Sequence, residues 1–278
     1  MRSAVTASWS TWLEMWSTWA RLSLFRRRVE WAKVAVRSAG KRRLYASLSG
    51  GKDSVAMVGL IHEAGIDVHC AHAHSDLNLP ESLSIVDAMC ERLNLSYDIV
   101  EPERDPWQMM AEFPPGIDVS AFRWRDALAR ECSAGNLLVQ YCYTPHAWGL
   151  PADAEPQSWD GAFVGLRSDE SNGRLANRKV RGSLYQSAID ETWTCTPIVD
   201  WSARDVFAFI VSRNLPIHPF YRRACEEMNL DPEKQRIDWL FGTEMMNALG
   251  ALVPIRKLYP NHWRRLILVR PELAQYAP

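Results

Sequence analysis

Residues 44–54 read LYASL followed by SGGKDS, and they organise the interpretation of the rest of the chain. Leu44 to Leu48 predict a short buried strand, and the residues from Ser54 to Ala64 predict a helix ended by Gly65. Between them, two glycines let the backbone turn sharply and bring its N–H groups close to an anion. Because a helix N-terminus adds partial positive charge, this strand–loop–helix unit predicts a phosphate site.

The side chains of this loop suit the same chemistry. Lys52 adds a positive charge, and Ser49 and Ser54 offer hydroxyl donors. Asp53 is the odd member, because phosphate repels a carboxylate unless a cation lies between them. A Mg²⁺ ion held by Asp53 would lie between this carboxylate and the phosphate oxygens and remove the repulsion. The loop is not a Walker A sequence. The alternative is an ordinary Gly-Gly turn followed by a surface lysine.

Further strands and helices alternate along the chain. Strands are predicted at 66–73, 97–100 and 162–166, and a helix that begins near Pro80 carries apolar residues at helical spacing. Ser202 resembles an N-cap with Asp205 three residues later. This alternation predicts an α/β fold with a doubly wound, mostly parallel sheet and helices on both faces.

Four ordered motifs resemble the phosphoadenosine phosphosulfate reductase-like branch of the PP-loop adenine nucleotide α-hydrolase superfamily, whose members cleave ATP between the α and β phosphates. Residues 49–54 resemble the S-G-G-x-D-S loop, and residues 75–82 resemble D-T-G-x-x-x-P-E-T. Residues 165–174 are similar to G-x-R-x-x-E-S-x-x-R. Residues 196–221 are similar to P-I-x-x-W…D-V-W…P-x-x-P-x-Y. Together these motifs cover roughly residues 43–221.

The resemblance implies a set of site residues. Lys52, Asp53 and Arg167 are the predicted catalytic residues. Arg167 falls at the carboxyl end of a predicted strand, where its guanidinium can clamp an anionic group. The residues predicted to contact the nucleotide are Ser47, Ser49, Gly50, Gly51, Lys52, Asp53, Ser54, Asp76, Gly165, Arg167, Ser171 and Arg174. Three further arginines either extend this anion-binding surface or belong to a solvated helix face: Arg174, Arg178 and Arg181.

The cysteines depart from the family pattern. The reductases carry a catalytic cysteine in an E-C-G-[IL]-H segment near the C-terminus, whereas no cysteine follows Cys225 here. The six cysteines also lack paired spacing, so we expect no iron–sulfur cluster and a reducing, cytoplasmic location. The favoured function is ATP cleavage linked to adenylation or sulfur transfer. Sulfonucleotide reduction, ATP sulfurylase-like activity, and a nucleotide-binding accessory subunit of a DNA sulfur modification or mobile-element defence complex stay open.

The N-terminal segment has a different character. Four tryptophans recur at helical spacing within a helix predicted over residues 9–36: Trp9, Trp12, Trp16 and Trp19. The favoured interpretation is packing on the chain's own core, and the alternative is a protein partner or a homodimer contact. We therefore expect an N-terminal helical segment (1–42), a nucleotide-binding domain (43–221) and a C-terminal extension (222–278).

Charge and hydropathy bear on whether the chain binds nucleic acid or enters a membrane. The 32 basic and 33 acidic residues nearly cancel, so nucleic acid is expected only as an indirect partner. No apolar run is long enough to span a membrane, and the N-terminus lacks the pattern of an export signal. Three histidines lie close together in the sequence and could form a metal site: His69, His72 and His74. The favoured interpretation is that they are ordinary hydrogen-bonding residues.

Overall fold

The computed structural model describes residues 7–113, 159–188, 191–237 and 245–276. In this part of the chain, a six-stranded sheet has the order β3-β2-β1-β4-β6-β5. Its strands are β1 (Leu44–Ser47), β2 (Cys70–Ala73), β3 (Tyr97–Val100), β4 (Gly161–Phe163), β5 (Leu184–Gln186) and β6 (Trp193–Cys195). All neighbouring pairs are parallel except β5 and β6. The predicted doubly wound α/β fold is therefore confirmed.

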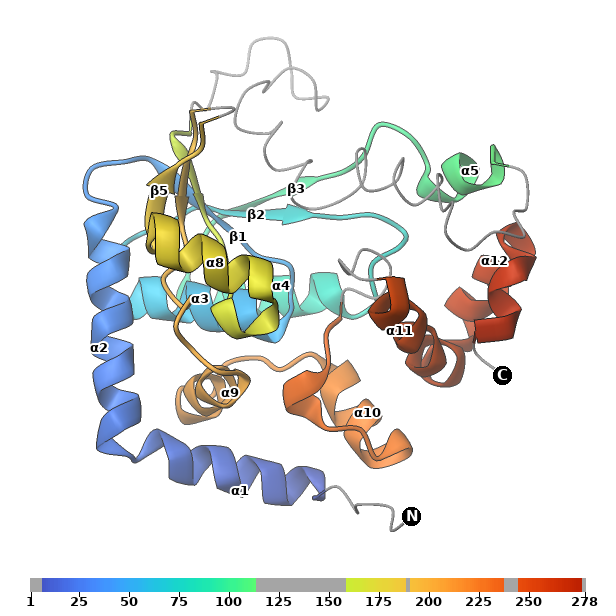
Figure 1. The fold of residues 1–278 in the computed structure, drawn as a ribbon, viewed down its shortest axis with the longest axis horizontal. Helices are drawn as coiled ribbons and strands as arrows, with labels where there is room; N and C mark the ends of the chain where they lie inside the picture. The colour runs from blue at the N-terminus through green and yellow to red at the C-terminus, as the bar shows by residue number, and fades with distance from the viewer. Residues whose placement is uncertain (1–6, 114–158, 189–190, 238–244, 277–278) are drawn as a thin grey trace.

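Helices surround the sheet (Figure 1). They are α1 (Trp9–Ala20), α2 (Ser23–Ser38), α3 (Lys52–Glu63), α4 (Ser82–Leu93), α5 (Pro106–Ala111), α8 (Asn172–Arg181), α9 (Ala203–Ser212), α10 (Pro219–Met228), α11 (Met245–Leu258) and α12 (Pro260–Val269). The described residues also form the 3₁₀ helices η3 (Ser168–Glu170), η4 (Pro232–Lys234) and η5 (Pro271–Tyr276).

The N-terminal helix differs from its prediction. The single helix expected over residues 9–36 is two helices that meet at Arg21 and Leu22, and Figure 1 shows them running in different directions. The two helices diverge because they pack on different partners: α1 packs on α9, whereas α2 packs on α3. No glycine or proline marks this corner in the sequence.

The tryptophan stripe of α1 faces the chain's own core. Trp12 and Trp16 are buried, and Trp9 and Trp19 are partly buried against the same cluster. The favoured interpretation of the stripe is therefore correct. A partner or homodimer contact through the four tryptophans stays a prediction, and the burial of Trp12 and Trp16 leaves little of their surface for it.

A second buried anchor holds these helices in place. Asp205, at the start of α9, is fully buried, and it forms a capping box with Ser202, the predicted N-cap. Its carboxylate also accepts hydrogen bonds from Trp19 Nε1 (2.9 Å) and Arg28 (2.5 Å). One residue therefore begins α9 and holds both N-terminal helices on it.

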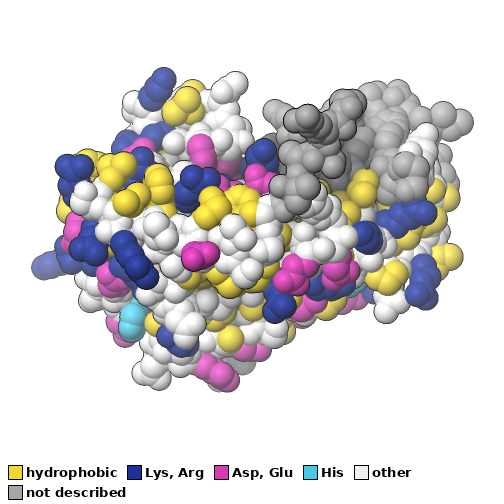
Figure 2. All heavy atoms as spheres, turned by 90° about the horizontal axis from the view of Figure 1, so that it is seen from below, with side chains coloured by type: hydrophobic (Ala, Val, Ile, Leu, Met, Phe, Trp, Pro, Cys, Tyr) yellow, Lys and Arg dark blue, Asp and Glu magenta, His cyan; other side chains and the backbone are white. Residues whose placement is uncertain are grey.

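One apolar cluster joins the parts of the chain. It extends from Trp12 in α1 to Leu273 in η5 and includes residues of the sheet and of α9. The boundaries proposed at 42 and 221 stay a prediction. Among the described residues, no helix is long and apolar enough to cross a membrane. Acidic and basic side chains are interspersed on the face in Figure 2.

Candidate functional site

The site lies where two neighbouring parallel strands end. After β1 the chain continues to β2 and β3 on one side, and β4 then pairs with the other side of β1. This reversal places a topological switch point between β1 and β4, the location where open α/β sheets bind ligands. The loop 49–54 follows β1, and Gly165 and Arg167 follow β4. The fold thus brings these two sequence motifs together.

Two glycines allow the close approaches that the loop requires. Gly50 has a φ of +79°, and a Cβ at this position would lie 2.7 Å from the carbonyl oxygen of Ser82 in α4. A Cβ at Gly165 would lie 2.9 Å from the carbonyl oxygen of Asp53. Contacts this short exclude a side chain at either position unless the backbone shifts. The two motifs therefore pack backbone to backbone.

The serine hydroxyls shape the loop. Ser54 Oγ accepts a hydrogen bond from the backbone N–H of Ser49 (3.2 Å) and donates to the carbonyl of Gly51 (3.0 Å). Ser49 Oγ lies 3.1 Å from Ser54 Oγ and accepts the N–H of Gly51 at 3.4 Å. The hydroxyls of Ser49 and Ser54, which were predicted to donate to phosphate, therefore form hydrogen bonds within the loop in this structure.

Lys52 is the first residue of α3, and its side chain is only 1% exposed. Its ammonium lies 3.0 Å from Asp53 Oδ2 and donates to the carbonyl of Gln235, also at 3.0 Å. Its backbone N–H donates to the hydroxyl of Tyr221 (3.2 Å), whose pKa burial raises. The alternative of a surface lysine after an ordinary turn is therefore wrong.

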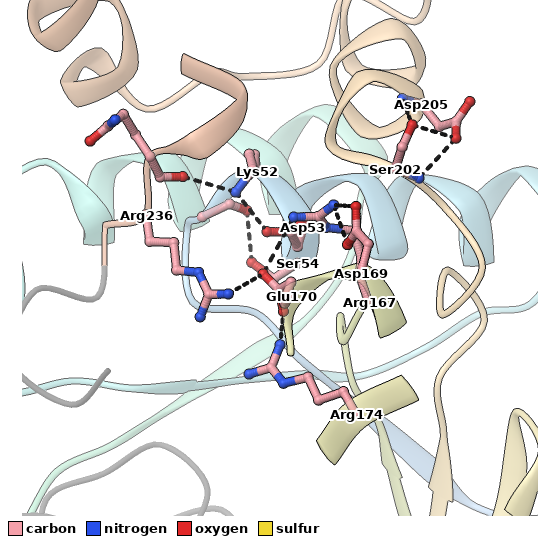
Figure 3. Close-up of polar contacts among 12 residues, drawn as sticks. Lys52, Asp53, Ser54, Arg167, Asp169, Glu170, Arg174, Ser202, Asp205 and Arg236 are labelled. Carbon is pink, nitrogen blue, oxygen red and sulfur yellow. Dashed lines mark hydrogen bonds and ion pairs between the residues drawn. The ribbon is translucent and has the colours of Figure 1, made fainter. Parts of the chain in front are cut away.

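Asp53 lies between two cations (Figure 3). Its Oδ1 accepts from Arg167 Nε at 2.7 Å, while Lys52 approaches Oδ2. Burial disfavours the charged carboxylate, but the neighbouring Lys52 and Arg167 outweigh it and hold the pKa of Asp53 below its usual value. The repulsion between this carboxylate and a phosphate is therefore offset by two basic side chains.

Glu170 gathers three arginines. Its carboxylate is 6% exposed and pairs with Arg167 (3.4 Å), with Arg236 (3.1 Å) and with Arg174. Arg167 also contacts both oxygens of Asp169, at 2.8 and 2.9 Å. Sequence reasoning missed Arg236 as a member of this cluster. It follows η4, far along the chain from the other arginines, and no local pattern marks it.

The other predicted contacts lie in different settings. Ser47 is the half-buried last residue of β1, next to the loop. Asp76 is largely exposed and pairs with Arg265 of α12 at 3.1 Å, which connects it to the C-terminal helices. Ser171 caps α8, because its hydroxyl accepts the backbone N–H of Arg174 (3.2 Å). A ligand role for these residues stays a prediction.

His72 and four of the cysteines are buried in the part of the chain that the structure describes. His72 is buried, its Nδ1 donates to the carbonyl of Leu48 (2.8 Å), and burial lowers its pKa. Among the described cysteines, Cys70, Cys90, Cys195 and Cys225 are all buried. Burial raises the pKa of Cys195 to about 12 and also raises that of Cys225. Cys132 and Cys142 lie outside the described residues.

A family model described as the phosphoadenosine phosphosulfate reductase domain matches residues 43–228. The chain belongs to this family. It is 26% identical over 199 residues to the phosphoadenosine 5'-phosphosulfate reductase of Xanthomonas euvesicatoria pv. vesicatoria, covering 71% of this chain and 72% of that protein. The reductase of Xylella fastidiosa (strain M12) is 24% identical over 188 residues, covering 64% and 67%.

Solved structures of similar fold include a phosphoadenylyl-sulfate reductase from Candida auris in a phosphate complex. It has a TM-score of 0.48 and 12% identity and covers 82% of this chain and 95% of its own. A second structure is the U34-tRNA thiolase NcsA from Methanococcus maripaludis with its [4Fe-4S] cluster. It has a TM-score of 0.47 and 13% identity, and the match covers 90% of this chain and 80% of NcsA.

The predicted Mg²⁺ site on Asp53 is wrong for this structure. Among the described residues, no group of three or more His, Cys, Asp or Glu side chains could hold a metal ion. The carboxylate of Asp53 is paired with Lys52 and Arg167, and two nearby positive charges disfavour a cation there.

Proposed function

We propose that this chain is an enzyme that binds ATP through the loop 49–54 and cleaves it between the α and β phosphates. An acceptor attacks the α-phosphorus, the bond to the bridging oxygen breaks, and pyrophosphate leaves with that electron pair. The observation that carries the proposal is the convergence of Lys52 and Arg167 on a glycine-rich turn at the switch point.

Each group has a role in this chemistry. Lys52 and the amides of Gly50 and Gly51 hold the leaving pyrophosphate, because charge develops on its oxygens as the bond breaks. Arg167 leaves Asp169 or Asp53 to clamp an anionic group of the substrate. Glu170 keeps Arg174 and Arg236 close by. Such a site acts by positioning and charge neutralisation.

A second candidate function is reduction of a sulfonucleotide, favoured by the names of the curated relatives. Against it, the sequence has no E-C-G-[IL]-H segment, and the four described thiols are buried. Burial raises the pKa of Cys195 and of Cys225 and so disfavours the thiolate that would attack sulfur. Release of sulfite from a sulfonucleotide with thioredoxin as reductant would favour this second function over ATP cleavage.

Calorimetry tests the binding step. ATP, adenylyl sulfate and its 3′-phosphorylated form are titrated into the wild type, Lys52→Ala and the control Lys41→Ala. Lys41 is exposed and precedes β1, at the opposite end of that strand from the loop. We expect ATP to bind the wild type and the control equally and Lys52→Ala at least about tenfold more weakly, because a charge-assisted contact contributes about 1.5–3 kcal/mol. Unchanged ATP affinity in Lys52→Ala would overturn the proposal.

Turnover is measured separately, as pyrophosphate released with each of a panel of acceptors that includes sulfate. Pyrophosphate release that Lys52→Ala abolishes would support cleavage between the α and β phosphates. ATP binding with no pyrophosphate release from any acceptor would instead favour the accessory-subunit interpretation.

A further inference from the structure

A segment close to the C-terminal helices covers the phosphate loop. We call residues 231–237 the strap. The carbonyl of Gln235 accepts the ammonium of Lys52 at 3.0 Å. Ile237 lies so near Gly51 that a Cβ built there would be 3.4 Å from its Cδ1 and Cγ1. Arg236 reaches Glu170 beside Lys52 (Figure 3). The strap therefore contacts the loop through Gln235 and Ile237, and Arg236 between them pairs with the neighbouring Glu170.

The strap occupies the approach to the loop. Gly50, Gly51 and Lys52 are all buried in this structure. A phosphate that reaches Lys52 would compete with the Gln235 carbonyl and would need Ile237 to withdraw from Gly51. Binding of an anion at the loop therefore carries the free-energy cost of displacing the strap.

The strap is anchored to the N-terminal helix. Glu233, two residues before Gln235, accepts Trp16 Nε1 at 3.0 Å and Arg204 Nε at 3.0 Å. Trp16 cannot easily move, because it is fully buried and stacks on Phe207 with ring centroids 4.2 Å apart and planes 10° from parallel. The position of α1 is thus transmitted to the strap by one indole.

The same rings reach the loop by a second route. Phe207 contacts Tyr221 edge to face at 5.4 Å, and the Tyr221 hydroxyl accepts the backbone N–H of Lys52 at 3.2 Å. Trp16 is therefore connected to Lys52 on two sides, through the strap and through Tyr221. Helix α1 lies outside the residues that match the family model, 43–228.

We propose that Trp16 and Glu233 are positioning residues that hold the strap on the phosphate loop, so that helix α1 sets the affinity of the site for nucleotide. The proposal rests on the proposed function. The proposal predicts that weakening the contact between Trp16 and Glu233 makes the strap easier to displace and so increases the affinity for nucleotide. General loss of packing would weaken binding instead.

Trp16→Phe tests this direction. The phenyl ring keeps the stack on Phe207 and loses the hydrogen bond to Glu233. Trp12→Phe is the matched control on the same helix, because Trp12 is also buried but its Nε1 has no hydrogen-bond partner among the described residues. By calorimetry we expect Trp16→Phe to lower the Kd for ATP about threefold to tenfold, and Trp12→Phe to leave it unchanged. An unchanged or higher Kd in Trp16→Phe would overturn the proposal.

A second measurement needs no nucleotide. Lys234 and Arg236 are trypsin sites within the strap, and Lys234 is 81% exposed. In the ligand-free protein, we expect trypsin to cut after these residues faster in Trp16→Phe and in Glu233→Gln than in the wild type or in Trp12→Phe. Equal rates in all four proteins would refute the anchor. If no variant binds ATP, the proposed function fails, whereas the cleavage rates still decide whether Trp16 holds the strap.

Discussion

The tight approach of the phosphate loop to α4 can be measured with a pair of glycines. Gly50 and Gly65 have the same φ of +79°, but a Cβ at Gly50 would lie 2.7 Å from the carbonyl oxygen of Ser82, whereas one at Gly65 has nothing within 4 Å. Gly65→Ala is therefore expected to lower the free energy of unfolding by about 1 kcal/mol, because alanine disfavours the left-handed backbone conformation at this position. Gly50→Ala adds an overpacking cost of about 1–3 kcal/mol, which brings its total to about 2–4 kcal/mol.

Urea unfolding of the two variants and the wild type gives these free energies directly. Calorimetry with ATP adds the functional consequence, because displacing the turn moves its amides away from the phosphates. We expect Gly65→Ala to retain ATP binding and Gly50→Ala to lose most of it. Equal destabilisation of the two variants would show that the loop does not press against Ser82, and the geometry argued for the site would be refuted.

Two further predictions concern buried groups. Burial lowers the pKa of His218 to about 4. Protonation therefore favours the unfolded chain, and stability falls as pH drops from about 6.5 towards 4. Between about pH 7 and 5 the free energy of unfolding of the wild type, measured in urea, should fall by about 2 kcal/mol more than that of His218→Asn. The asparagine keeps a side-chain acceptor at the helix N-cap. Parallel pH profiles of the two proteins would contradict this prediction. Asp205→Ala should cost about 3–5 kcal/mol, because Arg28 and Trp19 lose their buried acceptor; a loss under about 1 kcal/mol in thermal or urea unfolding would argue against the anchor.

The sequence predicted the part of the site that is local. The strand, the double-glycine turn and the helix after it follow from consecutive residues, so the loop 49–54 was found in its correct setting. Arg167 was expected beside this loop because it follows a predicted strand and belongs to an ordered motif, and its guanidinium does contact Asp53. The capping box of Ser202 and Asp205 is also local, and the structure contains it.

What the sequence could not give depends on contacts between distant segments. Arg236 joins the site only because the strap crosses the loop and reaches Glu170, whose other two arginine partners, Arg167 and Arg174, are local in the sequence. The corner between α1 and α2 reflects packing on two different helices. Strand β5 is short and antiparallel, and its three residues carry too little pattern to be recognised.

The charges of the site explain why it needs positioning devices. Four basic side chains (Lys52, Arg167, Arg174 and Arg236) are paired with three carboxylates (Asp53, Asp169 and Glu170). With so small an excess of positive charge, an anion is not drawn in by net attraction alone. It must exchange places with existing partners, among them the Gln235 carbonyl on Lys52. When binding is an exchange, its free energy depends on how firmly the displaced partners are held. Residues that hold the strap, including those on α1, therefore belong to the energetics of the site even though they do not touch the ligand.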